Sequence, residues 1–231
     1  MSAPATKPPT AHADGHRERL RARLLEDGDA LLDHELVEYL LTLVIPRVDT
    51  QPLAKRLLHE FGGIGGLLSA SPDALRRALK DNDRQVAAIK IAQAAALRLL
   101  RAEVAAKPVL SNWQALLDYL RADMAHAGVE RVRVLHLNTR NMLIRDELMG
   151  EGSIDEAPVY TREVIRRAMD LGSAAVILVH NHPSGDPKPS KADIDITRAI
   201  ADAGKRLGIA VHDHVIIGTQ GHASLRAMGL I

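Results

Sequence analysis

The spacing of apolar and polar residues divides the chain into two stretches. From about residue 16 to residue 107, apolar residues recur with helical spacing, which predicts a bundle of helices. Beyond Pro108, short apolar runs alternate with helical patterns, which predicts a mixture of strands and helices. We therefore expect a small all-α module at 16–107 followed by an α/β module at 108–231.

Helix start and stop signals define the elements of the first module. Asp33 is expected to cap its second helix, which Pro46 ends. Ser71 followed by Pro72 has the sequence of a cap and a first helical residue. The expected helices lie around 20–25, at 33–45, at 50–61 before Gly62, from 72 onward and at 83–106.

The second module contains at least one predicted hairpin. Ser111 and Gln114 have capping-box spacing and predict a helix to about His126. The remaining elements are expected as strands at 131–137 and 142–149, a helix at 161–171, a strand at 174–179, a helix at 190–207 and a strand at 209–217. This mixture favours an α/β sandwich with a mixed sheet over a Rossmann sheet.

Composition excludes several kinds of protein. Without cysteine there are no disulfides, thiolate zinc fingers or cysteine nucleophiles, and the chain suits a reducing cytoplasm. The net charge of +1 gives no general attraction to nucleic acid or membrane, and 2% aromatic residues provide little surface for stacking bases. No apolar run reaches the roughly 18–20 residues of a membrane span. Residues 1–15 lack the apolar core of a signal peptide and are expected to form a disordered tail.

The stretch from His180 to Asp193 carries the clearest chemistry. His180 and His182 follow an apolar strand, and strand geometry points both imidazoles to the same face. A loop rich in proline and glycine leads to Ser190, the expected cap of a helix whose first turn contains Asp193. Two imidazoles and one carboxylate suit a zinc site with three protein ligands and water in the fourth position. Ser190 and Asp193 also have the spacing of a purely structural capping box.

This stretch also matches a family pattern. The order H-x-H, seven residues, then S-x-x-D resembles the JAMM motif of JAB1/MPN zinc metalloproteases. The longer wording VHNHPSGDPKPSKADIDIT, followed by VHDHVIIG, is similar to the bacterial RadC branch of that superfamily, over about residues 109–231. The resemblance implies an MPN-type, cytidine-deaminase-like α/β sandwich. It further implies a metallopeptidase or isopeptidase with Zn²⁺ on His180, His182 and Asp193, and an oxyanion contact from Ser190.

The resemblance also implies a glutamate that moves protons. In the family it lies at the start of the first strand of the core, which in this chain is Glu130. Glu147 and Glu151, near the end of the expected hairpin, are the alternatives. A second H-x-H, His212 and His214, is expected to share one strand face. We interpret that pair as packing beside the first site or supporting its ligands, rather than as a second metal site.

The RadC resemblance extends more weakly to the first module, through residues 23–28, 33–36 and 61–64. The family usually carries a helix-hairpin-helix-like unit there, with a Gly-x-Gly turn for phosphate. Here the turn reads Lys80-Asp81-Asn82, and residues 1–107 contain 16 Lys and Arg against 14 Asp and Glu. Both observations count against DNA contact and favour an interaction or dimerisation module.

Three functions therefore remain open. The leading hypothesis is a zinc metallopeptidase or isopeptidase acting on a protein or peptide in the cytoplasm, as a monomer or homodimer and without membrane contact. The alternatives are an MPN scaffold without catalysis and a factor associated with DNA repair or recombination.

Overall fold

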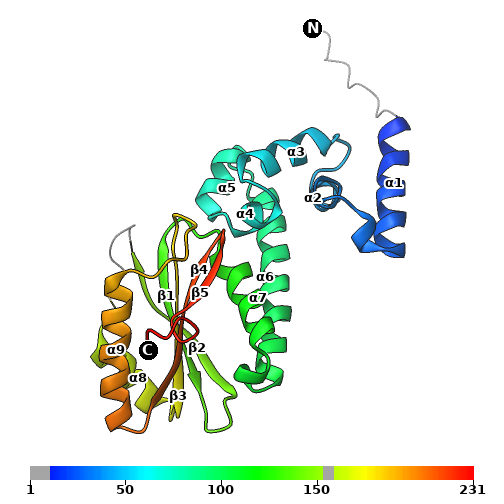
Figure 1. The fold of residues 1–231 in the computed structure, drawn as a ribbon. Coiled ribbons are helices and arrows are strands. Elements are labelled where there is room, and N and C mark those ends of the chain that lie inside the picture. The colour runs from blue at the N-terminus through cyan, green and yellow to red at the C-terminus, as the bar shows by residue number, and fades with distance from the viewer. Residues whose placement is uncertain (1–10, 153–158) are drawn as a thin grey trace. The chain divides into compact units, whose positions relative to one another are not determined.

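The computed structural model describes residues 11–152 and 159–231, and the chain folds as two compact units (Figure 1). The first unit is Met1–Ala94 and the second is Ala95–Ile231. The division falls inside the long helix α6 (Asp83–Ala106), which ends just before Pro108. None of the described helices offers the continuous apolar length that crossing a bilayer requires.

The first unit is helical, as its apolar spacing predicts. Its elements are α1 (Ala11–Glu26), the 3-10 turn η1 (Gly28–Ala30), α2 (Asp33–Thr42), α3 (Gln51–Glu60), α4 (Ile64–Ser69), α5 (Pro72–Ala78) and the first part of α6. The apolar faces of α2 to α6 meet in one cluster that includes the fully buried Leu41, Leu57, Leu67, Leu75 and Ile89. Ser71 caps α5 as predicted, since its Oγ accepts a hydrogen bond from the backbone N–H of Ala74 (3.2 Å).

Helix α1 begins at Ala11 and so takes up residues 11–15 of the stretch expected as a tail, while residues 1–10 lie outside the described residues. Two expectations for this unit are wrong. Asp33 is the first residue of α2 rather than its cap, and the Glu35 carboxylate accepts the N–H of Leu32 (2.9 Å). That helix ends at Thr42, before it reaches Pro46.

The second unit is built on a mixed five-stranded sheet with the order β2-β1-β3-β4-β5. Its strands are β1 (Glu130–Leu137), β2 (Leu143–Gly152), β3 (Ala175–Asn181), β4 (Ala210–Gly218) and β5 (Gly221–Ser224). Strands β3 and β4 are parallel, and the other neighbouring pairs are antiparallel. The predicted α/β fold with a mixed sheet and a hairpin is therefore confirmed.

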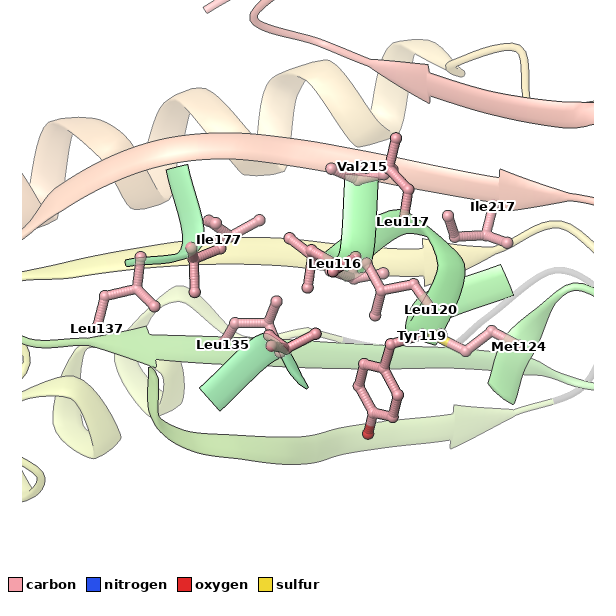
Figure 2. Close-up of a cluster of buried hydrophobic side chains, with 14 of the residues drawn as sticks. Leu116, Leu117, Tyr119, Leu120, Met124, Leu135, Leu137, Ile177, Val215 and Ile217 are labelled. Atoms are coloured by element: carbon pink, nitrogen blue, oxygen red, sulfur yellow. The ribbon is translucent and has the colours of Figure 1, made fainter. Parts of the chain in front are cut away.

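Helices cover both faces of this sheet (Figure 1). On one face, α7 (Trp113–Met124) packs Leu116 and Leu120 against Leu135 of β1, Ile177 of β3 and Val215 of β4 (Figure 2). On the other face, α8 (Thr161–Asp170) and α9 (Lys191–Arg206) cover a second apolar cluster. The central strand β3 is buried at all seven positions because it contributes to both clusters.

The start of α7 differs from the sequence-based expectation. Ser111 lies in a short 3-10 turn, η2 (Val109–Ser111), and its hydroxyl donates to the carbonyl of Pro108 (2.8 Å). Helix α7 begins at Trp113, and Gln114 reaches forward to Asp118 instead of back to a cap. The predicted capping box is therefore wrong, since the chain makes an extra turn before the helix starts.

A buried polar cluster fastens the β1–β2 hairpin to α7. Arg133 of β1 donates to the fully buried Asp146 of β2 (2.8 Å) and also pairs with Asp123 of α7. Tyr119 of α7 donates its hydroxyl to the same Asp146 (2.6 Å), and its burial raises the pKa of that phenol. Buried charges require such partners, so the cluster fixes the position of the strand that begins at Glu130.

Replacement of Leu120 by alanine tests the packing of α7 on the sheet. Leu120 is 0% exposed, so its truncation is expected to lower the free energy of unfolding by about 2–5 kcal/mol. Leu99→Ala is the matched control, because Leu99 is 74% exposed and its loss should cost less than about 0.5 kcal/mol. Urea denaturation followed by circular dichroism measures both, and equal losses would contradict this account of the core.

Candidate metal centre

Three side chains named from the sequence converge where β3 ends and α9 begins. His180 lies on β3, His182 follows the strand, and Asp193 is in the first turn of α9. The two Nε2 atoms are 2.9 Å apart, and the nearest Asp193 oxygens lie 3.3 Å from His180 Nε2 and 3.8 Å from His182 Nε2. Each side chain can therefore offer one ligand atom within 4.8 Å of the other two.

Local structure brings this convergence about. The extended backbone at the end of β3 points His180 and His182 to one face of the sheet. At the start of α9, Ser190 Oγ accepts the Asp193 N–H (3.1 Å) and Asp193 Oδ2 accepts the Ser190 N–H (2.7 Å). The structural capping box and the cluster therefore coexist, because Oδ1 of Asp193 remains directed at His180.

The loop between the histidines and α9 is held by the turn that joins β4 to β5. The backbone N–H of Gln220 donates to the carbonyl of Gly185 (3.1 Å), and that of His182 donates to Ile217 (2.9 Å). A Cβ at Gly218 would lie 2.2 Å from the Gly185 carbonyl oxygen, so only glycine permits this approach. The loop therefore has one docked position, which sets the position of His182.

Hydrogen bonding determines which nitrogen of His182 carries its proton. Nδ1 lies 2.8 Å from the backbone carbonyl oxygen of Asp186, and a carbonyl oxygen can only accept. Nδ1 must therefore be protonated in the neutral ring, which leaves the lone pair on Nε2, the atom that faces the cluster.

A chain of hydrogen bonds determines which nitrogen of His180 carries its proton. Thr197 donates its only hydroxyl hydrogen to the carbonyl of Asp193, so its Oγ1 must accept from His214 Nδ1, which lies 2.6 Å away. His214 Nε2 is then unprotonated and accepts from His180 Nδ1 at 2.7 Å. His180 Nε2 is left with a lone pair, as in His182. Burial lowers the pKa of His180 to about 4 and that of His214 to about 3, so both rings are neutral at pH 7.

With both rings in the neutral form, the cluster therefore presents three lone pairs with no proton between them. Burial acts to raise the pKa of the Asp193 carboxyl group, but hydrogen bonds from Ser190 oppose this, and the pKa lies below its ordinary value, so the group is ionised at pH 7. Ligand atoms about 2.0 Å from a tetrahedral ion stand roughly 3.3 Å apart, close to the separations found here. The donor set and its geometry fit a zinc ion.

The cluster opens into a pocket of about 610 Å³ whose lining includes Glu130 and Ser190. Val132 of β1 pairs with His180 of β3, so continuing the antiparallel register by two residues puts Glu130 level with His182. Glu130 also follows the strand alternation onto the face that carries the histidines. The structure thus brings together all five residues that the sequence nominated: His180, His182, Ser190, Asp193 and Glu130.

Asn181, between the two histidines, fixes the backbone around Glu130 from the opposite face of β3. Its Oδ1 accepts the N–H of Arg131 (2.9 Å), and its Nδ2 donates to the carbonyl of Val129 (3.1 Å). These residues directly precede and follow Glu130. Its Nδ2 also donates to the carbonyl of Ala127 at the longer distance of 3.5 Å, and since Asn181 is 1% exposed, its amide depends on these protein partners.

The two alternative glutamates lie elsewhere. Glu147 is held by Arg167 of α8 (2.8 Å), and Glu151 pairs with Arg131 (3.2 Å). Both line a separate hollow of about 540 Å³ between β2 and α8, which none of the clustered residues lines. Glu130 is the one of the three candidates that shares a pocket with the histidines and Asp193.

Comparison with protein families identifies the family to which the chain belongs. A family model described as a RadC-like JAB domain matches residues 110–230, just over half of the chain. The chain belongs to the RadC-like JAB domain family. It is therefore a member of the JAMM/MPN superfamily, and the resemblance inferred from the histidine motif is confirmed.

In the second histidine pair of the RadC-like domain, His214 supports a residue of the first site as expected, but the shared strand face is not found. Val176 pairs with Val211 but Ile177 pairs with Asp213, so β4 has a bulge at His212. The bulge breaks the alternation, and the prediction that His212 and His214 share a face is wrong. His214 joins the chain to His180, whereas His212 bonds Asn141 of the β1–β2 turn (2.7 Å).

The family match lies within the second unit and leaves the helical turn at Lys80 outside it. Lys80 and Asp81 both adopt left-handed backbone angles, with φ of 53° and 59°. The Asp81 N–H donates to the carbonyl of Arg76 (2.8 Å), and the Asn82 N–H donates to that of Leu79 (3.3 Å). These two amides are used inside the turn and are not directed at a ligand.

Replacement of His214 by phenylalanine tests the hydrogen-bond chain. An aromatic ring is kept but the acceptor for His180 Nδ1–H is lost, so we expect zinc affinity to fall about 10- to 100-fold. Competition with a fluorescent chelator measures the affinity, and thermal unfolding in the presence of the chelator checks the fold. His222→Phe, at an exposed histidine of β5, is the matched control. Unchanged affinity in His214→Phe would show that the tautomer is fixed in another way.

Proposed function

We propose that this protein is a zinc-dependent metallopeptidase or isopeptidase that hydrolyses an amide bond in a protein or peptide. The observation that carries the proposal is the convergence of the His180, His182 and Asp193 lone pairs in a pocket that Glu130 and Ser190 also line. The alternative of a scaffold without catalysis gives no reason for a glutamate to lie level with the histidines.

His180 Nε2, His182 Nε2 and an Asp193 oxygen are the proposed zinc ligands. Zinc bound there would supply Lewis acidity, which lowers the pKa of water to about 7 and polarises an amide carbonyl. The protein contributes the orientation of the ligands: His182 is held by the Asp186 carbonyl, and His180 is held through His214 and Thr197.

Glu130 is the proposed general base and acid. Its carboxylate takes a proton from the attacking water and delivers it to the leaving amine, so that one residue serves both proton transfers. This role needs a carboxylate at a fixed distance from the ligand cluster. The hydrogen bonds of Asn181 to Val129 and Arg131 supply that fixed position.

Ser190 is the proposed donor to the tetrahedral oxyanion. Its Oγ uses a lone pair to accept the Asp193 N–H, and its hydroxyl hydrogen, which also serves the Asp193 carboxylate, would turn toward the oxyanion in the pocket that Ser190 lines. A donor aimed at developing negative charge stabilises the transition state more than the ground state.

Replacement of Glu130 by glutamine separates catalysis from metal binding. Glutamine keeps the size of the side chain but cannot take a proton, so we expect hydrolysis to fall by about 10²- to 10⁴-fold while one zinc per chain is retained. The substrate is a proteome-derived peptide library, and mass spectrometry identifies new termini. Elemental analysis gives the zinc content.

Two further variants make this test specific. Asp193→Ala should lose both zinc and hydrolysis, whereas Glu151→Gln should keep both, because Glu151 lines the other hollow. If the zinc-loaded wild-type protein produces no new termini, the scaffold alternative replaces the hydrolase.

Replacement of Asn181 by aspartate tests how Glu130 is positioned. Aspartate can still accept the Arg131 N–H but has no hydrogen to donate to Val129, so the backbone beside Glu130 is expected to shift. We expect kcat to fall by up to about 100-fold with zinc affinity unchanged. Steady-state kinetics and chelator competition measure the two quantities, and a parallel loss of zinc would instead assign Asn181 to the ligand cluster.

A further inference from the structure

We propose that the inner end of the metal pocket is a subsite for an aliphatic side chain of the substrate, next to the amide that is cleaved. The inference rests on the proposed function and adds a substrate class to it. It derives from the way the lining of the pocket changes along β3 and α9.

The sheet side of the pocket turns apolar immediately beyond the histidines. Leu178 lies two residues before His180 on the same face of β3, about 7 Å further along the strand. Val132, the partner of His180 on β1, stands beside it on the same face. Both apolar side chains are almost fully buried, so this wall is firmly packed.

The helix side of the pocket changes in the same direction. Asp193, Ile196 and Ile200 are spaced by three and four residues, so they share the face of α9 that covers the sheet. With a rise of 1.5 Å per residue, Ile200 lies about 10 Å beyond Asp193 along the helix, and since it is 0% exposed it closes the inner end, where the half-buried Ile196 offers the open surface. Val159, just before α8, also lines the pocket. The pocket thus has one polar end with the proposed zinc ligands and one aliphatic end.

The charges around the pocket favour an uncharged occupant. Its charged or titratable lining consists of Glu130, Asp193 and the histidines, all at the polar end. Among the described residues that line it, none is lysine or arginine. A carboxylate or ammonium group at the aliphatic end would lose its hydration without gaining a partner, whereas a leucine-like side chain would gain from burial. The volume of about 610 Å³ lies in the range of pockets that enclose small ligands.

A series of hydroxamates tests the subsite without requiring turnover. Acetohydroxamate, 4-methylpentanoyl hydroxamate and the monohydroxamate of glutaric acid share a zinc-binding group and differ in the chain that would enter the pocket. Calorimetry on the zinc-loaded full chain is expected to show the 4-methylpentanoyl compound binding at least about tenfold more tightly than acetohydroxamate. The acidic compound is expected to gain nothing over acetohydroxamate.

Ile196 of α9 is half-buried and lines the pocket, so its replacement by tryptophan should fill the aliphatic end. We expect Ile196→Trp to abolish the gain in affinity from the 4-methylpentanoyl chain and to leave the affinity for acetohydroxamate unchanged. Ile144→Trp, on the edge strand β2 and 40% exposed, is the matched control that should keep the gain. Zinc content and thermal unfolding establish that both variants fold.

The possible results separate the two proposals. Equal affinities for all three compounds in wild-type protein, or a gain that survives Ile196→Trp, would overturn the subsite and leave the zinc hydrolase standing. Wild-type protein that takes up no zinc would overturn both. In the peptide library, wild-type protein should favour Leu, Ile, Val or Met at one position beside the cleaved bond, and Ile196→Trp should shift that position to Gly or Ala.

Discussion

The site depends on one constraint: the lone pairs of His180, His182 and Asp193 face one another where β3 ends. When both rings are in the neutral form, their Nε2 lone pairs 2.9 Å apart and the ionised carboxylate beside them repel one another unless a cation lies between them. The protons that could relieve this repulsion are held on the far sides of the rings, by the Asp186 carbonyl and by His214. The fold therefore maintains an arrangement that is unfavourable without a cation, and rigid packing has to enforce it.

Packing and hydrogen bonds meet that requirement from both faces of one strand. Strand β3 is buried at every position between α7 on one face and α8 and α9 on the other. Because side chains alternate along a strand, the last residues of β3 point to opposite faces. The histidines face the pocket, while Asn181 faces away from it and forms hydrogen bonds to the backbone on either side of Glu130. The strand thus sets the spacing between the ligand cluster and the proposed proton carrier, which makes Asn181 as important for geometry as the residues that touch the pocket.

Local signals in the sequence were enough to predict that His180, His182 and Asp193 come together, but not which residues support them. Strand alternation placed His180 and His182 on one face, and capping chemistry placed Asp193 on the first turn of α9. Thr197 was not predicted, because its role depends on β4 lying beside β3. The bulge at His212 was missed for the same reason, since register is a property of two strands. The errors at Asp33 and Ser111 have another cause: several polar residues near a helix start compete to cap it, and tertiary packing selects among them.

Asp193 has two roles, as part of the cap of α9 and as a proposed ligand, and this explains how folding alone brings the proposed ligands together. One carboxylate oxygen completes the cap of α9 and the other faces His180, so formation of the helix itself brings the acid to the histidines. Thr197, one turn further along the same helix, orients His214 and through it His180. A single helix docking on the sheet therefore positions one proposed ligand directly and another through hydrogen bonds. The conformational entropy of ordering these groups is lost during folding, so a cation that bound at the proposed site would meet ligands already in place.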